Sequence, residues 1–132
     1  MKDSLLNSVI MFIVANYEKS SVDRAKLISE LLAKKNFRVV YKKVNKDENN
    51  NVVMREAFCT LDFENLKNYS SRYCEYANKS KDDKKTNKRK AYESSCISYY
   101  DLEKDAFRCF KMNNLVEIEV IDNFNDIIQR IN

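Results

Sequence analysis

The sequence contains no glycine, proline, histidine or tryptophan among its 132 residues. Average usage would place about nine glycines and six or seven prolines in a chain of this length. Without glycine there is neither a phosphate-binding P-loop nor a dinucleotide-binding turn, because both need a backbone free of Cβ. Without histidine there is no histidine-based catalytic triad and no imidazole acid or base at neutral pH. These absences exclude many classes of enzyme.

Long apolar segments are also missing. The longest apolar run, Val9 to Ala15, has seven residues, far fewer than the ~20 that a membrane span needs. The N-terminus lacks the pattern of a signal peptide. With 44% hydrophobic and 33% charged residues, the chain is too apolar for wholesale disorder and too short for two full domains. We therefore expect a single domain, residues 1–132, located in the cytoplasm.

The four cysteines show no metal-binding spacing. They are Cys59, Cys74, Cys96 and Cys109. Without a CxxC pair a zinc ribbon is not expected, and in a cytoplasmic protein the thiols are expected to be reduced. Cys59 and Cys109 lie in apolar, strand-like runs, which predicts small core residues. The acidic segment 101–105 has the composition of a tight turn, so we predict no metal, no cofactor and no enzymatic activity.

Hydrophobic spacing predicts helices at both ends of the chain and strands between them. Residues 3–18 and 22–32 show helical periods, with a hydroxyl cap at Ser20–Ser21, so residues 1–35 are expected to form a helical hairpin. Two β-branched and aromatic runs flank the polar turn KDENNN, and three more follow between residues 96 and 121. Residues 63–78 are expected to be helical or irregular, and 122–132 a short helix. Asparagine and aspartate take the turn positions that glycine would normally occupy.

These elements predict an α+β fold. Five short strands can bury both faces of their sheet only if the sheet closes, so we expect a small, partly open barrel over residues 36–121, capped by the helices. Within it, a basic insertion over about residues 78–92 is expected to be flexible.

Two stretches, residues 37–63 and 96–120, resemble a known family. The pattern is a hairpin ending in Arg-Glu-Ala-x-x-Thr-Leu, an insertion, a Tyr-Asp turn, an aromatic-Arg-x-Phe strand and a closing Leu-Val-Glu-Ile strand. It resembles the small SH3 β-barrel fold proteins of unknown function from phages and mobile elements of gut bacteria. The second stretch also looks like strands of WYL domains, whose barrel binds ligands or nucleic acid beside transcription factors. The resemblance implies an SH3-like barrel, with Phe107 where the family usually has tryptophan.

Charge is distributed unevenly around a net value of +4. Residues 34–46 include six basic side chains and no acid, residues 79–90 include seven basic and two acidic ones, and the remainder has a net charge of −7. Basic segments attract polyanions and release counterions on binding them, but lysines also keep small proteins soluble. Both interpretations stay open for 34–46; for 79–90 we favour a solvated loop.

Arg55 and Arg108 interrupt otherwise apolar strands. Each either pairs with a carboxylate such as Asp101 or Glu56, which we favour, or contacts phosphate on the barrel surface. A stacking platform for bases would need exposed aromatics beside basic side chains. The aromatics considered are Tyr41 beside Lys42 and Lys43, Tyr99, and Tyr100 near Lys104. As core aromatics we expect Tyr41, Phe107 and Phe110.

We therefore expect a small, non-enzymatic, phage-type protein that binds nucleic acid through phosphate contacts in a regulatory or accessory role. The alternative is a protein–protein interaction module, either a virion component or an inhibitor of a host protein. The apolar N-terminal helix must be buried, centrally or in a homodimer. The candidate nucleic-acid-binding residues are Lys35, Arg38, Lys42, Lys43, Arg55, Lys84, Lys85, Lys88, Arg89, Tyr100 and Arg108.

Overall fold

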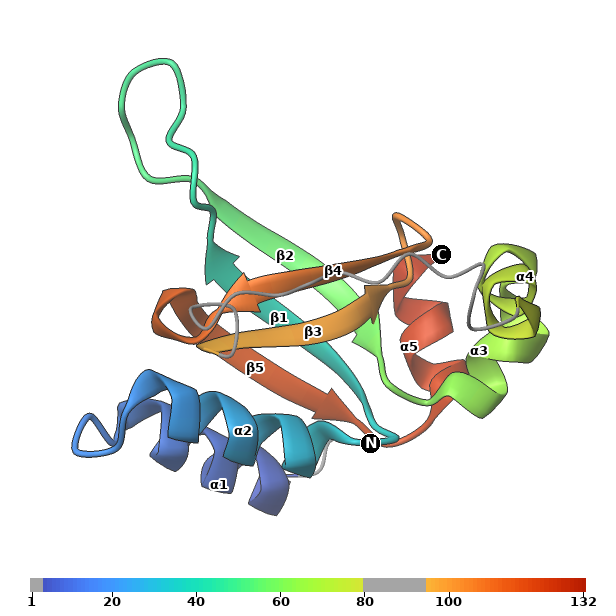
Figure 1. The fold of residues 1–132 in the computed structure, drawn as a ribbon, viewed down its shortest axis with the longest axis horizontal. Helices are drawn as coiled ribbons and strands as arrows, with labels where there is room; N and C mark the ends of the chain where they lie inside the picture. Colours follow the sequence, from blue (N-terminus) through green and yellow to red (C-terminus); the bar gives the residue numbers. More distant parts are fainter. Residues whose placement is uncertain (1–3, 80–94) are drawn as a thin grey trace.

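The computed structural model describes residues 4–79 and 95–132 and has an α+β architecture (Figure 1). Its elements in chain order are α1 (Ser4–Ala15), α2 (Ser21–Leu32), β1 (Asn36–Lys42), β2 (Met54–Thr60), α3 (Phe63–Tyr69), α4 (Ser71–Asn78), β3 (Cys96–Asp101), β4 (Ala106–Lys111), the 3-10 turn η2 (Met112–Asn114), β5 (Leu115–Ile121) and α5 (Phe124–Ile131). The predicted fold class, with two N-terminal helices, five strands and a C-terminal helix, is confirmed. No helix among the described residues is long and apolar enough to span a membrane.

The five strands form one antiparallel sheet in the order β4-β3-β2-β1-β5. Strand β1 pairs along most of its length with β2 on one side and β5 on the other. Strands β2 and β3 share only two residue pairs, Cys59 with Asp101 and Thr60 with Tyr100. Because this junction is so short, the two parts of the sheet diverge beyond it, and β4 and β5 remain as edge strands.

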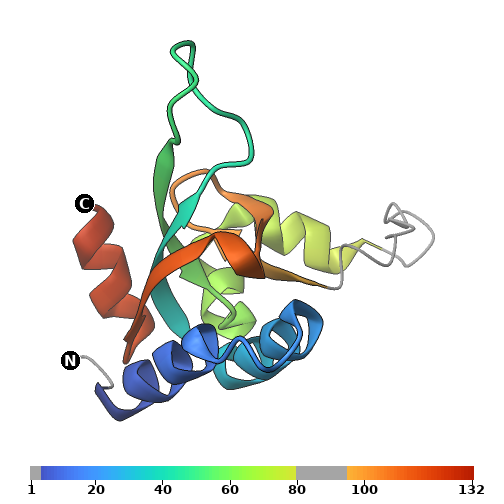
Figure 2. The same ribbon diagram turned by 90° about the vertical axis from the view of Figure 1, so that its left-hand side faces the viewer.

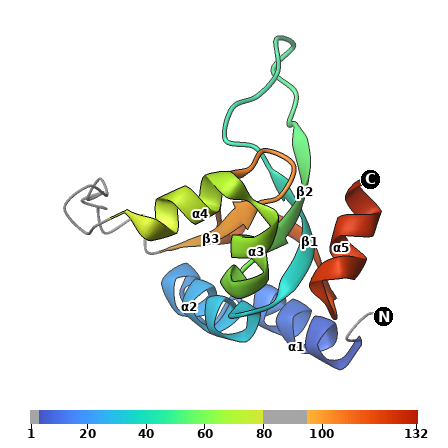
Figure 3. The same ribbon diagram turned by 90° about the vertical axis from the view of Figure 1, so that its right-hand side faces the viewer.

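The helices enclose the sheet from three sides. Figures 2 and 3 show the α1–α2 hairpin beneath the sheet, with α5 and α4 on opposite flanks. The predicted cap of α2 is present, since the Ser20 hydroxyl accepts a hydrogen bond from the Asp23 amide at 3.1 Å. Buried Arg24 fixes the hairpin by donating to the carbonyl of Val14 and to the side chain of Asn113.

The core lies between the inner face of the sheet and the helical hairpin. It includes Phe37, Val39, Tyr99 and Phe110, and Cys59 is buried among them as predicted. The prediction for Cys109 was wrong: it is exposed, because it lies on the outer face of edge strand β4, beside inward-facing Phe110.

The sequence of β5 predicts strict alternation, with Val116, Ile118 and Val120 on one face and Glu117 and Glu119 on the other, and the strand departs from it. A register shift between Val40 and Tyr41 places Leu115 opposite Tyr41, so Leu115 is buried and Val116 is partly exposed. A bulge of this kind adds one residue to one strand and turns the following side chains to the other face. Three residues adopt positive φ, namely Lys34, Asn50 and Asp105. Two of them are the asparagine and aspartate types expected in place of glycine.

Candidate functional site

The basic residues of segment 34–46 do not form one patch. Lys35 lies before β1 and Lys42 ends it, so the two are about 23 Å apart along the strand at ~3.3 Å per residue. Lys42 and Lys43 are exposed at the base of the long β1–β2 loop, which projects from the body in Figure 1. Lys84, Lys85, Lys88 and Arg89 lie outside the described residues.

The arginines have three different environments. Arg38 is held on the outer face of the sheet by Glu56 at 2.6 Å and Glu117 at 3.4 Å. Arg55 pairs with buried Asp101 at 2.5 Å, which confirms the favoured pairing for this residue. Arg108 is exposed on β4, opposite Tyr99, and no carboxylate within the described ranges pairs with it. Of the three, Arg108 is the one whose charge is available to a ligand.

The aromatics considered for base stacking are not accessible. Tyr41, Tyr99 and Tyr100 are all buried. The hydroxyls of Tyr41 and Tyr99 are hydrogen-bonded to each other at 3.1 Å inside the core, where Tyr41 also stacks on Phe110. The stacking role predicted for Tyr100 is therefore wrong, because its ring is only 2% exposed and its face is not open to a base.

Phe107 does not lie in the core, contrary to the prediction from its strand-like run. It was expected in the core, but 46% of its surface is exposed, and Tyr76 on α4 is 41% exposed beside it. Their ring centroids are 5.2 Å apart, and Tyr100 meets Phe107 edge-on at 5.0 Å. Tyr73 approaches the same ring at 6.0 Å. Four aromatic rings from α4, β3 and β4 therefore meet at one place on the surface.

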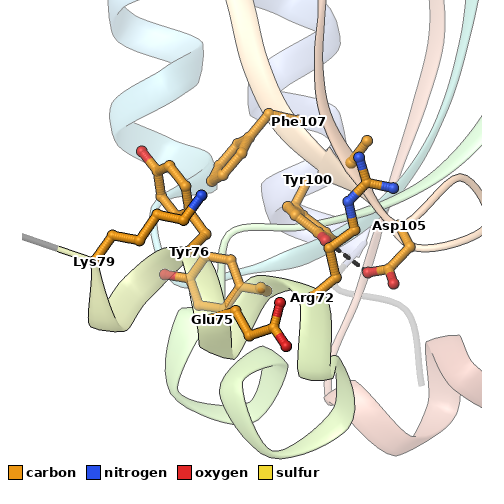
Figure 4. Close-up of a pocket in the computed structure, with 9 residues that line it drawn as sticks. Arg72, Glu75, Tyr76, Lys79, Tyr100, Asp105 and Phe107 are labelled. Carbon is orange, nitrogen blue, oxygen red and sulfur yellow. Dashed lines mark hydrogen bonds between the residues drawn. The ribbon is translucent and has the colours of Figure 1, made fainter. Parts of the chain in front are cut away.

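These rings line a pocket of about 360 Å³, which we call the aromatic pocket. Its walls are Arg72, Tyr73, Glu75, Tyr76, Lys79, Tyr100, Asp105, Ala106 and Phe107. Figure 4 shows Lys79 beside Tyr76 at one end and Arg72 near Asp105 at the other, with Tyr100 between them. The size is at the lower end of the range for small-molecule sites, so the pocket suits one flat group at a time.

The pocket is held together by Ser70, which precedes α4. Its hydroxyl accepts a hydrogen bond from the Tyr73 amide at 3.0 Å and donates one to the Asp105 carboxylate at 2.5 Å. The Tyr100 hydroxyl donates to the same carboxylate oxygen at 2.6 Å. One serine thus caps the helix and fixes it to the β3–β4 turn, which orients Tyr76 toward Phe107.

The charged side chains that line the pocket are two cations and two carboxylates, so their formal charges cancel. Burial alone would raise the pKa of Asp105, but the hydrogen bonds from Ser70 and Tyr100, with the charge of Arg72, lower it below its ordinary value. Burial and the hydrogen bond to Asp105 raise the pKa of Tyr100 to about 12. Burial also raises the pKa of Tyr73. The hydroxyls of Tyr73 and Tyr100 therefore stay neutral. The cations Arg72 and Lys79 face an equal number of carboxylates, Glu75 and Asp105.

This arrangement is suited to binding. Exposed rings stack on flat groups, and two cations at the ends of the pocket attract an anion attached to such a group. In the described part of the chain, no three cysteine, aspartate or glutamate side chains gather as they would around a metal ion.

A signal for the pocket exists in the sequence. Phe107 and Phe110 are three residues apart in one strand, so the period of two places them on opposite faces, and only one can enter the core. Tyr73 and Tyr76 are three apart, so they share a face once residues 71–78 are helical. What the sequence does not reveal is that this helix packs on that strand.

Comparison with known families identifies one match. The family model described as WYL_2, Sm-like SH3 beta-barrel fold, matches residues 24–116, from α2 to the start of β5. The matched range includes every residue of the aromatic pocket. Comparisons with curated proteins and with solved structures found no match. On the extent of this match and on the five-stranded fold, the chain belongs to the WYL_2 family of Sm-like SH3 β-barrels.

Proposed function

We propose that the protein binds single-stranded nucleic acid at the aromatic pocket, without reading its sequence. In this proposal an unpaired base stacks on Tyr76 and Phe107, and Arg72 and Lys79 contact the phosphates on either side. The binding serves a regulatory or accessory role in the cytoplasm, in a protein of phage or mobile-element origin. The observation that supports it best is the pair of half-exposed rings set between two cations.

Single strands are favoured over duplex because of the shape of the site. A stacking site needs a base whose flat face is free, which an unpaired strand offers and a stacked duplex does not. Arg72 lies in the first turn of α4, and Lys79 is the C-cap residue just after the helix, seven positions later, which is about 10 Å at 1.5 Å per residue. The two cations are therefore far enough apart to contact different phosphates of one strand.

The basic run that begins at Lys79 extends this proposal. Lys79 lines the pocket and is also the first residue of the 79–90 segment, whose net charge is +5. We propose that Lys84, Lys85, Lys88 and Arg89 neutralise neighbouring phosphates and release their counterions. Exposed Arg108 follows Phe107 on β4 but lies on the opposite face of the strand, so it is a candidate contact only for a phosphate outside the pocket.

Fluorescence anisotropy with labelled 20-nucleotide single strands tests the site. Tyr76→Ala and Phe107→Ala should each weaken binding about 5- to 150-fold, the value of one stacked base at 1–3 kcal/mol. The matched control is Tyr69→Ala on α3, a comparably exposed tyrosine that does not line the pocket. If both pocket variants bind like this control, or if wild type shows no binding at ~50 mM salt and micromolar protein, the proposal is wrong.

The salt dependence of the binding constant distinguishes the contribution of ring stacking from that of phosphate contacts. For single strands the slope of log K against log salt is about −0.7 per neutralised phosphate. Arg72→Gln and Lys79→Gln should each reduce its magnitude by ~0.7, whereas the ring variants should lower affinity at every salt concentration without changing the slope. The control Lys67→Gln, an exposed lysine on α3, should leave the slope unchanged.

A protein–protein interaction module remains the second candidate, supported by a different observation. The β1–β2 loop exposes the apolar side chains of Val44 and Val52, and Met54 is exposed where β2 begins. Figure 1 places this loop on the other side of the molecule from α4, which lines the pocket. Exposed apolar groups of this kind often mark protein contacts. In that case changes in the loop abolish binding to a protein partner, while substitutions in the pocket and in residues 79–90 have no effect.

A further inference from the structure

Helix α1 leaves one apolar face uncovered. Its inner face packs Ile10 and Val14 into the core, whereas Leu5 is 78%, Val9 41% and Phe12 73% exposed. These three residues follow the spacing of four and three that places side chains on one face of a helix. Figure 1 shows α1 at the outside of the molecule, next to α2. The helix is therefore covered on one side only.

The exposed face has no charge. No residue between Ser4 and Ala15 is acidic or basic. Surface helices normally present charged residues to solvent, and helices that lie on membranes have lysine or arginine on their polar face. A charged partner, such as nucleic acid, would find no counterion here. A second copy of this face matches it, since neither copy leaves a charge unpaired.

We propose that α1 is a homodimer interface, in which two copies of the helix pack antiparallel across a two-fold axis between Ser8 and Val9. In this arrangement Leu5 of each copy lies against Phe12 of the other. Ser8, exposed on the same face, lies opposite Val9 and leaves room for its branched side chain. The pairing is isologous, because each contact occurs twice, as two-fold symmetry requires.

The size of the face predicts a weak dimer. The exposed parts of the three side chains amount to about two whole side chains per copy, on the order of 350 Å². A stable complex buries ~800 Å² on each partner. We therefore expect a weak dimer that forms only at high protein concentration.

The dimer does not depend on the proposed nucleic-acid binding. Helix α1 lies before the segment that matches the family model, residues 24–116. Figures 1 and 3 place it away from α4, which lines the aromatic pocket, so that pocket stays open in the dimer.

Sedimentation equilibrium of the full chain tests the proposal. Between about 10 µM and 1 mM, the wild-type mass should rise from monomer toward dimer. The double variant Leu5→Glu, Phe12→Glu should remain monomeric, because it places four like charges in the interface of a dimer. The matched control is Val44→Glu, a similarly exposed valine in the β1–β2 loop, and it should dimerise like wild type.

Circular dichroism of the variants confirms that they fold, and Phe12→Ser is a milder substitution that should raise the dissociation constant at least several-fold. A wild-type monomer at 1 mM overturns the proposal. So does a dimer that persists in the double variant, or a chain that stays monomeric but sediments with neutral phosphatidylcholine vesicles. Loss of oligonucleotide binding at the pocket has no bearing on these results, so the two proposals fail separately.

Discussion

Replacing Arg55 by methionine tests how the barrel tolerates an isolated buried charge. The Asp101 side chain is 1% exposed and accepts a hydrogen bond from Arg55, while its other oxygen accepts the amides of Glu103 and Lys104 at 3.0 and 2.9 Å. In Arg55→Met the carboxylate keeps the two amides but loses its counterion. Removing one partner of a buried pair costs 3–5 kcal/mol, and because the amides remain we expect the lower end, about 3 kcal/mol.

The reciprocal variant should cost less. In Asp101→Asn the side chain left alone is Arg55, which is 21% exposed and long enough to turn toward water. The asparagine oxygen still accepts the two turn amides, so we expect a loss of about 1–2 kcal/mol. The double variant should be more stable than Arg55→Met alone, since no charge is left buried.

Urea unfolding followed by circular dichroism measures these differences as shifts of the midpoint at constant slope. Of the two single variants, Asp101→Asn should be the less destabilising. If Asp101→Asn proves more destabilising than Arg55→Met, or if Arg55→Met costs less than 1 kcal/mol, exposure of the partner left behind does not set the cost.

Three further predictions concern stability and reactivity. The pKa of Tyr100 is raised to about 12 in the folded state, so its contribution to stability is complete below pH 10, the unfolded value, and is lost as pH rises through 12. The midpoint temperature of thermal unfolding should therefore fall less steeply between pH 10 and 12 for Tyr100→Phe than for wild type. Ellman's reagent should react fast with exposed Cys109 and with Cys59 only after unfolding, since burial raises the pKa of the Cys59 thiol well above its ordinary value; Cys109→Ser should remove the fast phase. Arg24→Met should lose about 2–3 kcal/mol in urea unfolding, because the buried carbonyl of Val14 and the partly buried carbonyl of Lys19 lose their Arg24 donor, whereas Lys26→Met on the same helix should lose less than 0.5.

Much of the fold follows from local signals. The Ser20 cap, the two strand runs around the Asn-rich turn and the final helix after Asn123 each depend on neighbouring residues, so they can be predicted without knowing the tertiary structure. The break in β5 is different. Its bulge arises from pairing with β1, and the resulting exchange of Leu115 for Val116 in the core is invisible in the sequence of β5 alone.

The candidate site was harder to predict because it joins distant segments. Tyr76 and Phe107 are 31 positions apart, and the link between them is a hydrogen bond from the cap of one helix, Ser70, to a turn residue, Asp105. The basic residues did not locate the site either, because a run of charge along the chain does not show which side chains lie beside each residue in the fold. Arg38 lies in a basic run, yet its neighbours across the sheet, Glu56 and Glu117, are acidic.

Because the charges of the aromatic pocket balance, the proposed affinity for nucleic acid has to come partly from the pocket and partly from residues outside it. Arg72 and Lys79 are matched by Glu75 and Asp105, so the pocket has no net charge with which to attract a polyanion from a distance. Long-range attraction has to come from residues outside it, and the +5 segment that starts at Lys79 is covalently attached at its rim. Replacing Lys84, Lys85, Lys88 and Arg89 by glutamine should therefore lower the salt slope by up to ~3 and slow association. Ring substitutions should instead speed dissociation, because stacking forms only after the strand has arrived. Stopped-flow measurements distinguish the two effects, and an unchanged association rate in the quadruple variant would show that this segment takes no part in capture.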